Sequence, residues 1–321
     1  MESVLVTGGA GFIGSNIAEA LLAQGYRVVV LDDLSTGKME NVLDIKREDN
    51  LKFVKGSILD RGLLRSLLKS ENVKLISHQA AVSSVTKSIA DPVATMETNV
   101  AGTTNIFHVA AEYGCRRIVF ASSSSVYGDS PELPKRETMT PCPKSPYAMS
   151  KVAKELLGSV FSDLYGISII GLRYFNVYGR RQDPASDYAA VIPKFISKAL
   201  DNEPIPIEGD GGQTRDFIYI DDVVNANLGA LTGNGVSGTV FNVGNGKQTS
   251  ILELARTIIE LTESKSEIVF KPKRAGDIQD SVGDIEHAQR NLGYRKTFNI
   301  RKGLAKTIFW YRERVQKHRA A

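Results

Sequence analysis

The chain has 321 residues, enough for one large or two moderate domains, and its 42% apolar and 24% charged residues are typical of a globular protein. Its 40 basic and 36 acidic side chains leave a net charge of only +4, spread along the chain, which argues against binding of nucleic acid. Cys115 and Cys142 form no disulfide framework and have no partner at metal-ligand spacing, so we expect a cytoplasmic protein without a metal site. No apolar run reaches the roughly 18 residues of a membrane span.

Short apolar runs alternate with helical patterns through the first half of the chain. Between the runs, apolar residues recur at helical spacing, as at Ile13, Ile17 and Leu21, or along residues 152–164. Buried strands that alternate with helices predict an α/β fold, a doubly wound parallel sheet with helices on both faces. The predicted strands, all apolar on both faces, are residues 3–7, 27–33, 51–56, 73–81, 116–122 and 168–174.

A glycine-rich turn follows the first predicted strand and opens the first helix. Gly8, Gly11 and Gly14 leave room for a pyrophosphate beside backbone N–H groups at a helix N-terminus, as in Rossmann-type nucleotide-binding domains. Asp32 ends the second strand, where an acidic residue holds the adenosine ribose and repels a 2′-phosphate. The pattern predicts NAD rather than NADP; a plain turn with a solvated aspartate is the alternative.

Two polar groups come later in the first half. Residues 122–125 are four serines that directly follow a predicted strand. Tyr147 and Lys151 lie four apart on one face of a helix that Ser145 and Pro146 would open. A nearby ammonium and a positively charged nicotinamide could together supply the roughly 4 kcal/mol that brings a phenol from pKa 10 to 7. The alternative is a purely structural pair.

The pattern changes after about residue 175, where proline, glycine and short segments become frequent. Residues 205–231 suggest a loop, a strand and a helix, and residues 250–261 an amphipathic helix. We predict a Rossmann-type nucleotide-binding domain over residues 1–175, which also takes back about 213–233. A smaller mixed α/β domain over 176–321 would bind the substrate.

Nine segments that span nearly the whole chain carry a resemblance to a known family. They are "GGAGFIG", "DDLSTGK", "HQAA", "TNVAGT", "SSSSVYGD", "SPYAMSK", "RYFNVYG", "TRDFIYIDDV" and "RAGDI". Together they resemble the extended short-chain dehydrogenase/reductases and, within them, the UDP-hexose 4-epimerases. The first and sixth segments alone would indicate only the superfamily.

The resemblance implies an NAD-dependent epimerase in which Tyr147 is the general base, Lys151 lowers its pKa and binds the cofactor ribose, and Ser123 is the catalytic hydroxyl. The implied reaction removes the 4-OH proton and transfers the C4 hydride to NAD⁺. The 4-keto sugar then rotates and takes the hydride back on its other face. Because each cycle regenerates NAD, we expect the cofactor to stay tightly bound.

The resemblance also implies a cofactor site. Gln79, Ala80 and Ala81 would line the nicotinamide side and Tyr174 would flank the ring, while Asn99 would support the site or serve a structural role. At Ser57 and Ile58 the chain departs from the family pattern, which leaves the adenine contact open. The remaining implied cofactor residues are Gly8, Gly11, Phe12, Ile13, Gly14, Asp32, Asp33, Ser35, Thr36, Gly37, Ala121, Ser122, Tyr147 and Lys151.

The implied UDP-sugar site lies in both halves of the chain. Arg215 and Arg274 match diphosphate ligands, Asn176 a phosphate-side amide and Asp277 a ribose ligand. Ala190 and Val191 belong to the uracil-side segment. The sugar itself would contact Ser83, Ser84, Ser123, Ser124, Ser125 and Tyr147. We expect Arg180 and Arg181 to be solvated charges and His78 to be structural.

One position concerns the choice of sugar. Ser281 stands where family members restricted to plain hexoses carry a tyrosine, so its small side chain leaves room for an N-acetyl group. We therefore expect UDP-GlcNAc and UDP-GalNAc to be accepted besides UDP-glucose and UDP-galactose.

Two other functions compete with epimerisation. Similar 4,6-dehydratases and decarboxylases carry acidic residues directly before "VYG", where this chain has Ser124, Ser125 and Val126. A non-enzymatic NAD-sensing regulator would typically lack the Tyr147 and Lys151 pair. Finally, helices over 101–114 and 148–165 resemble a dimer-forming pair, so we expect a homodimer.

Overall fold

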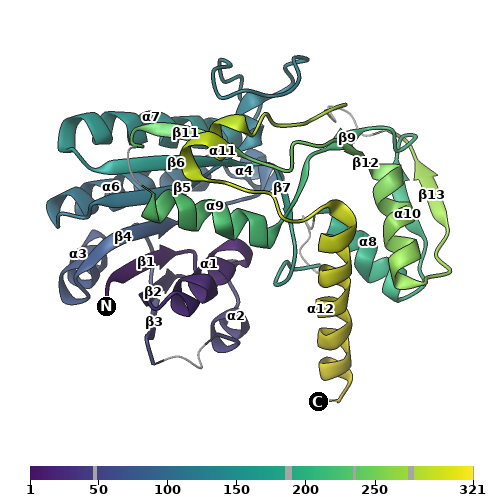
Figure 1. Cartoon of the computed structure of the whole chain (residues 1–321), viewed down its shortest axis with the longest axis horizontal. Coiled ribbons are helices and arrows are strands. Elements are labelled where there is room, and N and C mark those ends of the chain that lie inside the picture. Colours follow the sequence, from purple (N-terminus) through teal and green to yellow (C-terminus); the bar gives the residue numbers. More distant parts are fainter. Residues whose placement is uncertain (46–48, 185–189, 234–235, 274–277, 321) are drawn as a thin grey trace.

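The computed structural model describes residues 1–45, 49–184, 190–233, 236–273 and 278–320. A seven-stranded sheet in the order β11–β6–β5–β4–β1–β2–β3, with every neighbouring pair parallel, forms its centre (Figure 1). The strands are β1 (Ser3–Thr7), β2 (Arg27–Asp32), β3 (Leu51–Lys55), β4 (Val73–His78), β5 (Arg117–Ser123), β6 (Ser168–Tyr174) and β11 (Thr239–Val243). The predicted doubly wound parallel sheet is confirmed, and the six predicted runs are its first six strands.

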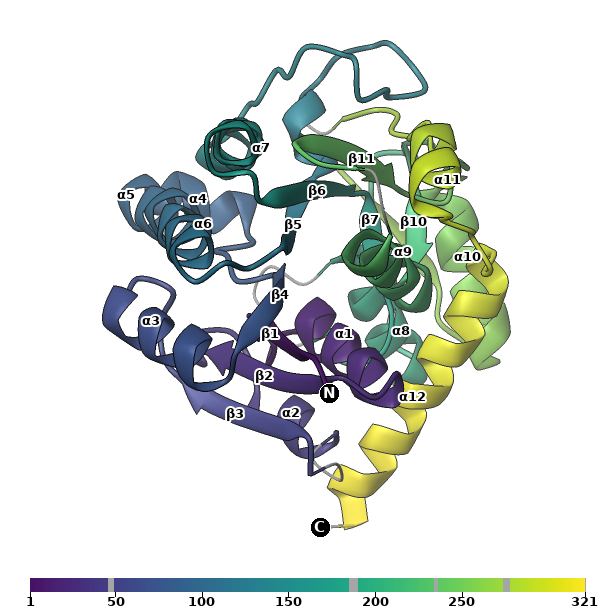
Figure 2. The ribbon, with the colours of Figure 1, turned by 60° about the vertical axis from the view of Figure 1, so that its left-hand side comes forward.

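The strands are apolar on both faces because the sheet separates two cores. Val4 and Val6 pack into one core, whereas Leu5 between them packs into the other, and all three are fully buried. The first core is covered by α1 (Phe12–Ala23) and α9 (Ile220–Thr232). The second is covered by α3 (Arg61–Ser70), α6 (Gly102–Glu112) and α7 (Pro146–Tyr165), on the opposite side of the sheet (Figure 2).

The chain leaves the sheet after β6 and later returns to it. Helix α9 contacts β4, β5 and β6, and β11 then adds the strand beside β6. Residues 213–233, which the sequence assigns back to the first domain, contain α9, while β11 follows that segment. The division of the chain into two domains near residue 175 stays a prediction.

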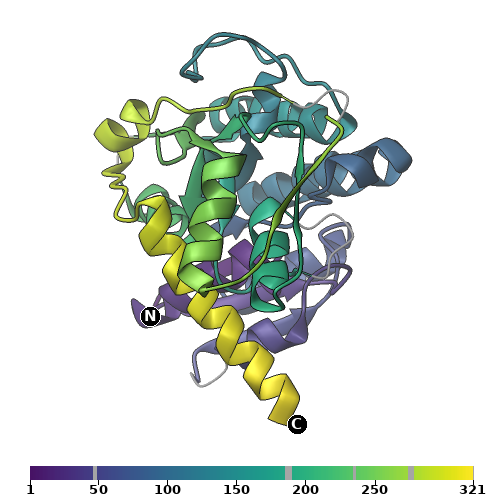
Figure 3. The ribbon, with the colours of Figure 1, turned by 90° about the vertical axis from the view of Figure 1, so that its right-hand side faces the viewer.

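A second group of elements lies beyond the carboxyl ends of the strands (Figure 1). Three short strand pairs belong to it: β7 (Asn176–Tyr178) with β10 (Phe217–Tyr219), β8 (Ile205–Glu208) with β13 (Ile268–Lys271), and β9 (Thr214–Arg215) with β12 (Thr249–Ser250). Helices α8 (Val191–Leu200), α10 (Ile251–Thr262) and α12 (Ile300–Ala320) pack together beside them (Figure 3).

The remaining helical segments are short and mostly surround the sheet's carboxyl edge. They are α2 (Met39–Leu43), α4 (Val85–Ala90), α5 (Pro92–Met96), a π-helical turn (Glu97–Ala101), a 3-10 turn (Ser124–Tyr127) and α11 (Glu286–Leu292). No helix in the described part of the chain is long and apolar enough to span a membrane. Ligands of open parallel sheets bind beside the carboxyl ends of the strands, which places the site between the sheet and the second group of elements.

Candidate active site

The glycine turn has the geometry that the sequence predicts for a pyrophosphate cradle. Gly8 adopts φ +66°, and a Cβ added there would lie 2.7 Å from the backbone nitrogen of Ala80. A Cβ at Gly14 would lie only 2.2 Å from the carbonyl oxygen of Gly8. Gly11 then caps α1, whose first residues are Phe12 and Ile13. Only glycines permit this approach of helix to turn, and the exposed backbone suits a dinucleotide phosphate.

Asp32 ends β2 directly beside the glycine turn. Its carboxylate accepts hydrogen bonds from the N–H groups of Ala10 at 2.9 Å and Leu34 at 2.8 Å. Burial raises the pKa of Asp32, although these two donors lower it. The predicted residues Asp33, Ser35, Thr36 and Gly37 form the adjoining loop, in which Asp33 accepts from the Ser35 N–H at 2.9 Å. The carboxylate is therefore fixed beside the glycine turn, and its contact with a cofactor ribose stays a prediction.

Two of the residues predicted for the nicotinamide side, Gln79 and Tyr174, are joined by a hydrogen bond. Gln79, Ala80 and Ala81 directly follow β4, and Tyr174 ends β6. The Tyr174 hydroxyl is 3.1 Å from Gln79 Oε1 and 3.0 Å from Asn227 Oδ1 on α9. Asn227 is fully buried, and the sequence analysis missed it because a lone amide in an apolar helix carries no local signal.

The residues predicted for the adenine side have local partners. Ser57 Oγ accepts the N–H of Leu59 at 3.2 Å. Ile58 is buried and packs against Gly102, where an added Cβ would lie 2.6 Å from Ile58 Cδ1. Both residues close the turn after β3, and their contact with adenine stays a prediction.

Ser123, Tyr147 and Lys151 come together at the end of β5. Ser145 Oγ accepts the Ala148 N–H at 3.1 Å and Pro146 is the first residue of α7, so Tyr147 stands in the first helical turn. The Tyr147 side chain is hydrogen-bonded to Ser123. Lys151 Nζ lies 5.3 Å from the centroid of the Tyr147 ring and donates to the Ala121 carbonyl at 2.9 Å. The predicted catalytic residues are thus neighbours in space.

The protonation of this group depends on burial. Burial raises the pKa of Tyr147, while the Ser123 hydrogen bond lowers it. Burial also lowers the pKa of Lys151 to about 8, although the Glu155 carboxylate raises it. The positive end of the α7 dipole favours the phenolate by about 0.3–1 kcal/mol. The protein alone therefore leaves Tyr147 protonated at neutral pH, and a positively charged nicotinamide would have to supply the further stabilisation of the phenolate.

Asn99 connects the catalytic helix to the loop after β4. It is fully buried in the π-helical turn, and its Oδ1 accepts the Val82 N–H at 2.7 Å. Its Nδ2 donates to the Val82 carbonyl at 3.1 Å and to Ser150 Oγ at 3.0 Å. These contacts support the structural interpretation of Asn99. Beyond Val82, Ser83 is exposed and Ser84 caps α4 by accepting the Lys87 N–H at 3.1 Å.

The four serines occupy different positions. Ser122 and Ser123 end β5, whereas Ser124 and Ser125 begin the 3-10 turn. Ser122 Oγ donates to Glu155, and Ser123 Oγ accepts the Ser125 N–H at 3.1 Å. The buried Ser125 Oγ has no hydrogen-bond partner among the described residues. An orphaned hydroxyl at this edge of the sheet fits a pocket for a polar ligand.

The other predicted substrate residues that the structure describes lie in or beside the second group of elements. Asn176 is exposed at the start of β7, and Ala190 and Val191 open α8. Arg215 on β9 donates to the Thr214 carbonyl at 2.8 Å, and the Thr214 N–H donates to the Gln279 carbonyl at 2.9 Å. The strand β9 therefore runs beside the segment that leads to the half-buried Ser281. Arg274 and Asp277 lie outside the described residues.

Arg180 and Arg181 are not the solvated charges that we expected. Arg181 is buried and pairs with Glu19 of α1 at 3.1 Å. Arg180 also pairs with Glu19, and it lies 3.7 Å from Asp221. Burial alone would raise the pKa of Glu19, but the two arginines hold it below its usual value. The two arginines therefore join α1 to the second group of elements. The sequence alone did not indicate this contact.

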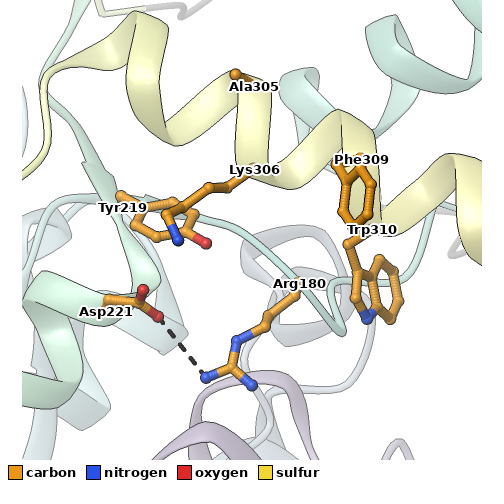
Figure 4. A pocket seen from close by; sticks show the side chains of 7 residues that line it. All are labelled: Arg180, Tyr219, Asp221, Ala305, Lys306, Phe309 and Trp310. Carbon is orange, nitrogen blue, oxygen red and sulfur yellow. Dashed lines mark ion pairs between the residues drawn. The ribbon is translucent and has the colours of Figure 1, made fainter.

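A surface pocket of about 520 Å³ lies next to this junction and away from Tyr147. Figure 4 shows Arg180 and Asp221 on one side of the pocket. The aromatic rings of Phe309 and Trp310, which belong to α12, also line it. Tyr219, Ala305 and Lys306 complete its lining. None of the predicted catalytic or cofactor residues contributes to this pocket, so it is separate from the candidate active site.

Comparison with known proteins agrees with this geometry. Residues 4–244 match the NAD dependent epimerase/dehydratase family. The chain is 40% identical over 313 residues to the UDP-glucose 4-epimerase of Mycolicibacterium smegmatis, covering 97% of this chain and 99% of the relative. It is 33% identical over 320 residues to the UDP-N-acetyl-alpha-D-glucosaminuronate decarboxylase of Bacillus cytotoxicus, covering 96% and 97%.

Solved structures show the same similarity. The UDP-glucose 4-epimerase of Thermotoga maritima with UDP-glucose superposes with a TM-score of 0.92 at 36% identity, covering 98% of this chain and 99% of that one. The UDP-N-acetylglucosamine 4-epimerase of Methanobrevibacter ruminantium, in complex with UDP-N-acetylmuramic acid, also gives 0.92, at 37% identity and the same coverage. The chain therefore belongs to the NAD dependent epimerase/dehydratase family, and it is an epimerase that uses NAD.

Proposed function

We propose that the enzyme is a UDP-hexose 4-epimerase that interconverts UDP-glucose with UDP-galactose and UDP-GlcNAc with UDP-GalNAc. The observation that carries the proposal is the meeting of Ser123, Tyr147 and Lys151 at the end of β5, on the sheet edge that also carries the glycine turn after β1. A base and a hydroxyl at this edge suit removal of a proton from a sugar alcohol.

The chain's own residues would handle the proton. Tyr147 accepts the proton of the sugar 4-hydroxyl, and Ser123 holds the same oxygen by a hydrogen bond. The Lys151 ammonium stabilises the phenolate that Tyr147 must form before it can act as a base. When bound, NAD would supply the acceptor for the C4 hydride and the source from which that hydride returns. When the 4-keto group is reduced on its other face, Tyr147 gives the proton back to O4.

The rival chemistries need an acidic side chain at a position where this sequence has none. Dehydration or decarboxylation at the same sugar would use an acidic side chain just before Tyr127, where the chain has Ser124, Ser125 and Val126. The nearest described carboxylate on α7, Glu155, is engaged by Arg173 and Ser122. A non-enzymatic NAD sensor would not need the buried Lys151 beside Tyr147.

The test is an assay with each of the four UDP-sugars and no added NAD. The purified enzyme should interconvert both pairs, and denaturation should release about one NAD per chain. A 4-keto-6-deoxy or decarboxylated product would instead establish one of the rival activities. A requirement for stoichiometric NADH would show a net reductase.

We also propose that the enzyme is a cytoplasmic homodimer. Both cysteines are free thiols, as expected in a reducing compartment. On the side of α7, large apolar side chains are exposed on three helices, and a second copy of the chain would bury them. We call this surface the α7 face; it consists of Ile89 on α4, Val93 on α5, and Met149, Leu156, Val160 and Leu164 on α7.

A further inference from the structure

A buried ion pair lies directly behind the serine run. Glu155 follows Lys151 by four residues on α7, and Arg173 stands near the end of β6. Arg173 Nε donates to Glu155 Oε1 at 2.9 Å and Nη2 donates to Oε2 at 2.7 Å. Only 8% of the Glu155 side chain and 4% of the Arg173 side chain is exposed. This two-point geometry compensates both charges and fixes their relative orientation.

Each partner of the ion pair also holds one end of the segment 122–127, which contains the four serines. Ser122 Oγ, at the end of β5, donates to Glu155. Arg173 Nη1 donates at 2.9 Å to the hydroxyl of Tyr127, the last residue of the 3-10 turn, and its guanidinium lies 4.9 Å from the ring centroid. Ser123 therefore lies between two residues that a single ion pair anchors.

The Tyr127 end is anchored a second time. Its hydroxyl donates to Asn242 Oδ1 on β11 at 2.6 Å, and Asn242 Nδ2 donates to the Lys135 carbonyl at 2.8 Å. Because the hydroxyl donates once and accepts once, its direction is fixed. The turn that follows Ser123 is thus held by side chains from β6 and β11.

The same helix face also holds the residue before the run. Lys151 Nζ donates to the Ala121 carbonyl at 2.9 Å, one helical turn before Glu155 binds Ser122. The Glu155 carboxylate raises the pKa of Lys151, which burial lowers. The other charged or titratable groups near Lys151 are Tyr147 and Lys154 of α7, His78 of β4, and Arg173 of β6 through Glu155.

We propose that Glu155 and Arg173 are positioning residues, which fix Ser123 relative to Tyr147 by anchoring Ser122 and Tyr127. They touch neither the sugar nor the cofactor. The inference rests on the proposed function, because it requires Ser123 to be the hydroxyl that binds the sugar 4-oxygen. A variant that lacks the ion pair would still contain Ser123, but Ser122 and Tyr127 on its two sides would no longer be anchored.

The first test compares two isosteric variants, E155Q and E71Q. Glu71 is a matched control because 6% of its side chain is exposed and it pairs with Arg27 at 2.8 Å and Lys52 at 2.7 Å, away from the site. E155Q should lower kcat about 10- to 100-fold, since small misplacement of reacting groups costs this much, while bound NAD and the KM for the sugar change little. E71Q should lower the melting temperature but keep kcat.

The second test asks whether Glu155 acts through Ser123. If it does, Ser123→Ala should cost much less in the E155Q background than in the wild type, because the hydroxyl is already misplaced. E155Q should also move the alkaline limb of the kcat profile to lower pH, since Lys151 loses the carboxylate that supports its charge. A purely structural role would leave the cost of S123A unchanged in the E155Q background, whereas the shift of the alkaline limb reports only the charge of Glu155 on Lys151.

The outcomes separate this inference from the proposed function. If the losses of kcat caused by S123A and by E155Q multiply in the double variant, the positioning role alone is overturned. A wild-type kcat for E155Q would have the same consequence. A wild-type rate for S123A would overturn the proposed role of Ser123 and the inference with it. If E155Q does not fold, Tyr127→Phe keeps the ion pair and releases one end of the run; it should lower kcat and couple to S123A, and independence would overturn the inference.

Discussion

At the scale of single residues, Ser281 is the position at which the proposed choice of sugar can be tested. Its half-buried side chain follows the segment that pairs with β9, next to the proposed diphosphate ligand Arg215. Ser281→Tyr should fill the space beside C2 and lower kcat/KM for UDP-GlcNAc and UDP-GalNAc about 5- to 150-fold, because overfilling a pocket costs about 1–3 kcal/mol. The plain hexoses should be nearly unaffected. Equal loss for both pairs in the epimerisation assay would disprove the assignment.

The pKa of Lys151 predicts the alkaline limb of the pH profile. Burial places this pKa at about 8, so the ammonium that supports the Tyr147 phenolate is lost as the pH rises through that value. We expect kcat to fall above about pH 8. The unfolded chain keeps Lys151 protonated to its ordinary pKa of 10.5, so it binds more protons than the folded state in this window, and the Lys151 contribution to stability rises with pH.

Because kcat should fall while the Lys151 contribution to stability rises over the same pH range, the melting temperature serves as the control for this prediction. Measuring kcat and the melting temperature on the same samples, from about pH 6 to about pH 10, separates loss of catalysis from loss of structure. A melting temperature that falls in parallel with kcat would assign the limb to unfolding instead of to Lys151.

Some residues could be found from the sequence and others could not. Gly8, Asp32, Tyr147 and Lys151 lie in short segments whose spacing alone indicates their geometry, and the structure places them as that spacing suggests. Asn227 meets Tyr174 across 53 residues, and Glu155 and Arg173 pair between a helix and the following strand at no helical or strand spacing, so no local pattern marks them. Arg181 looked like a surface charge because its partner, Glu19, lies 162 residues away.

At the scale of elements, the turn before α1 predicts a specific loss of cofactor. Gly14→Ala places a Cβ 2.2 Å from the Gly8 carbonyl, so α1 must move away from the phosphate cradle. We expect little NAD in the denatured extract and a melting temperature lowered by the equivalent of about 1–3 kcal/mol. Gly114→Ala is the control, because Gly114 has φ +62° and nothing within 4 Å of its Cβ position. That variant should lose stability from backbone strain yet keep its NAD.

Helix α7 shows where the periodicity of the sequence was informative and where it was not. The pattern along residues 152–164 predicts a helix, and α7 (Pro146–Tyr165) covers it. Leu156 and Leu164, however, are 64% and 72% exposed, while Lys151, Lys154 and Gly158 are buried. An apolar stripe marks a face that seeks burial, but it does not say whether the sheet or a second molecule provides it.

At the scale of the whole molecule, the α7 face predicts the oligomeric state. Scattered exposed apolar residues are ordinary, but a contiguous group on neighbouring helices marks an interface. We expect the wild type to sediment as a dimer at micromolar concentration. Leu156→Glu with Leu164→Glu should give a folded monomer with unchanged NAD content. Glutamates at the exposed Phe309 and Val269, far from this face, should leave the dimer intact. A monomeric wild type would refute the proposal.

Ion pairs also connect α12 and the segment after β7 to residues near α2. Arg314 on α12 pairs with Glu40 and lies 3.5 Å from Asp44, and Lys38 pairs with Asp183 at 2.7 Å. Each pair is partly exposed to solvent and contributes about 0–1 kcal/mol. Together with Arg181 and Glu19 they join the second group of elements to α1, to α2 and to the loop that follows β2.

The regular spacing on α7 also limits how this protein can change over evolutionary time. Tyr147, Lys151 and Glu155 follow one another at four-residue intervals, and each meets a different partner along β5 and β6. Inserting or deleting one residue between them would turn the following side chains by about 100° around the helix. Single substitutions at positions of this stretch that make none of these contacts are compatible with the site, but insertions and deletions are not. Among homologues that keep the activity, alignment gaps should therefore be absent between positions 147 and 155.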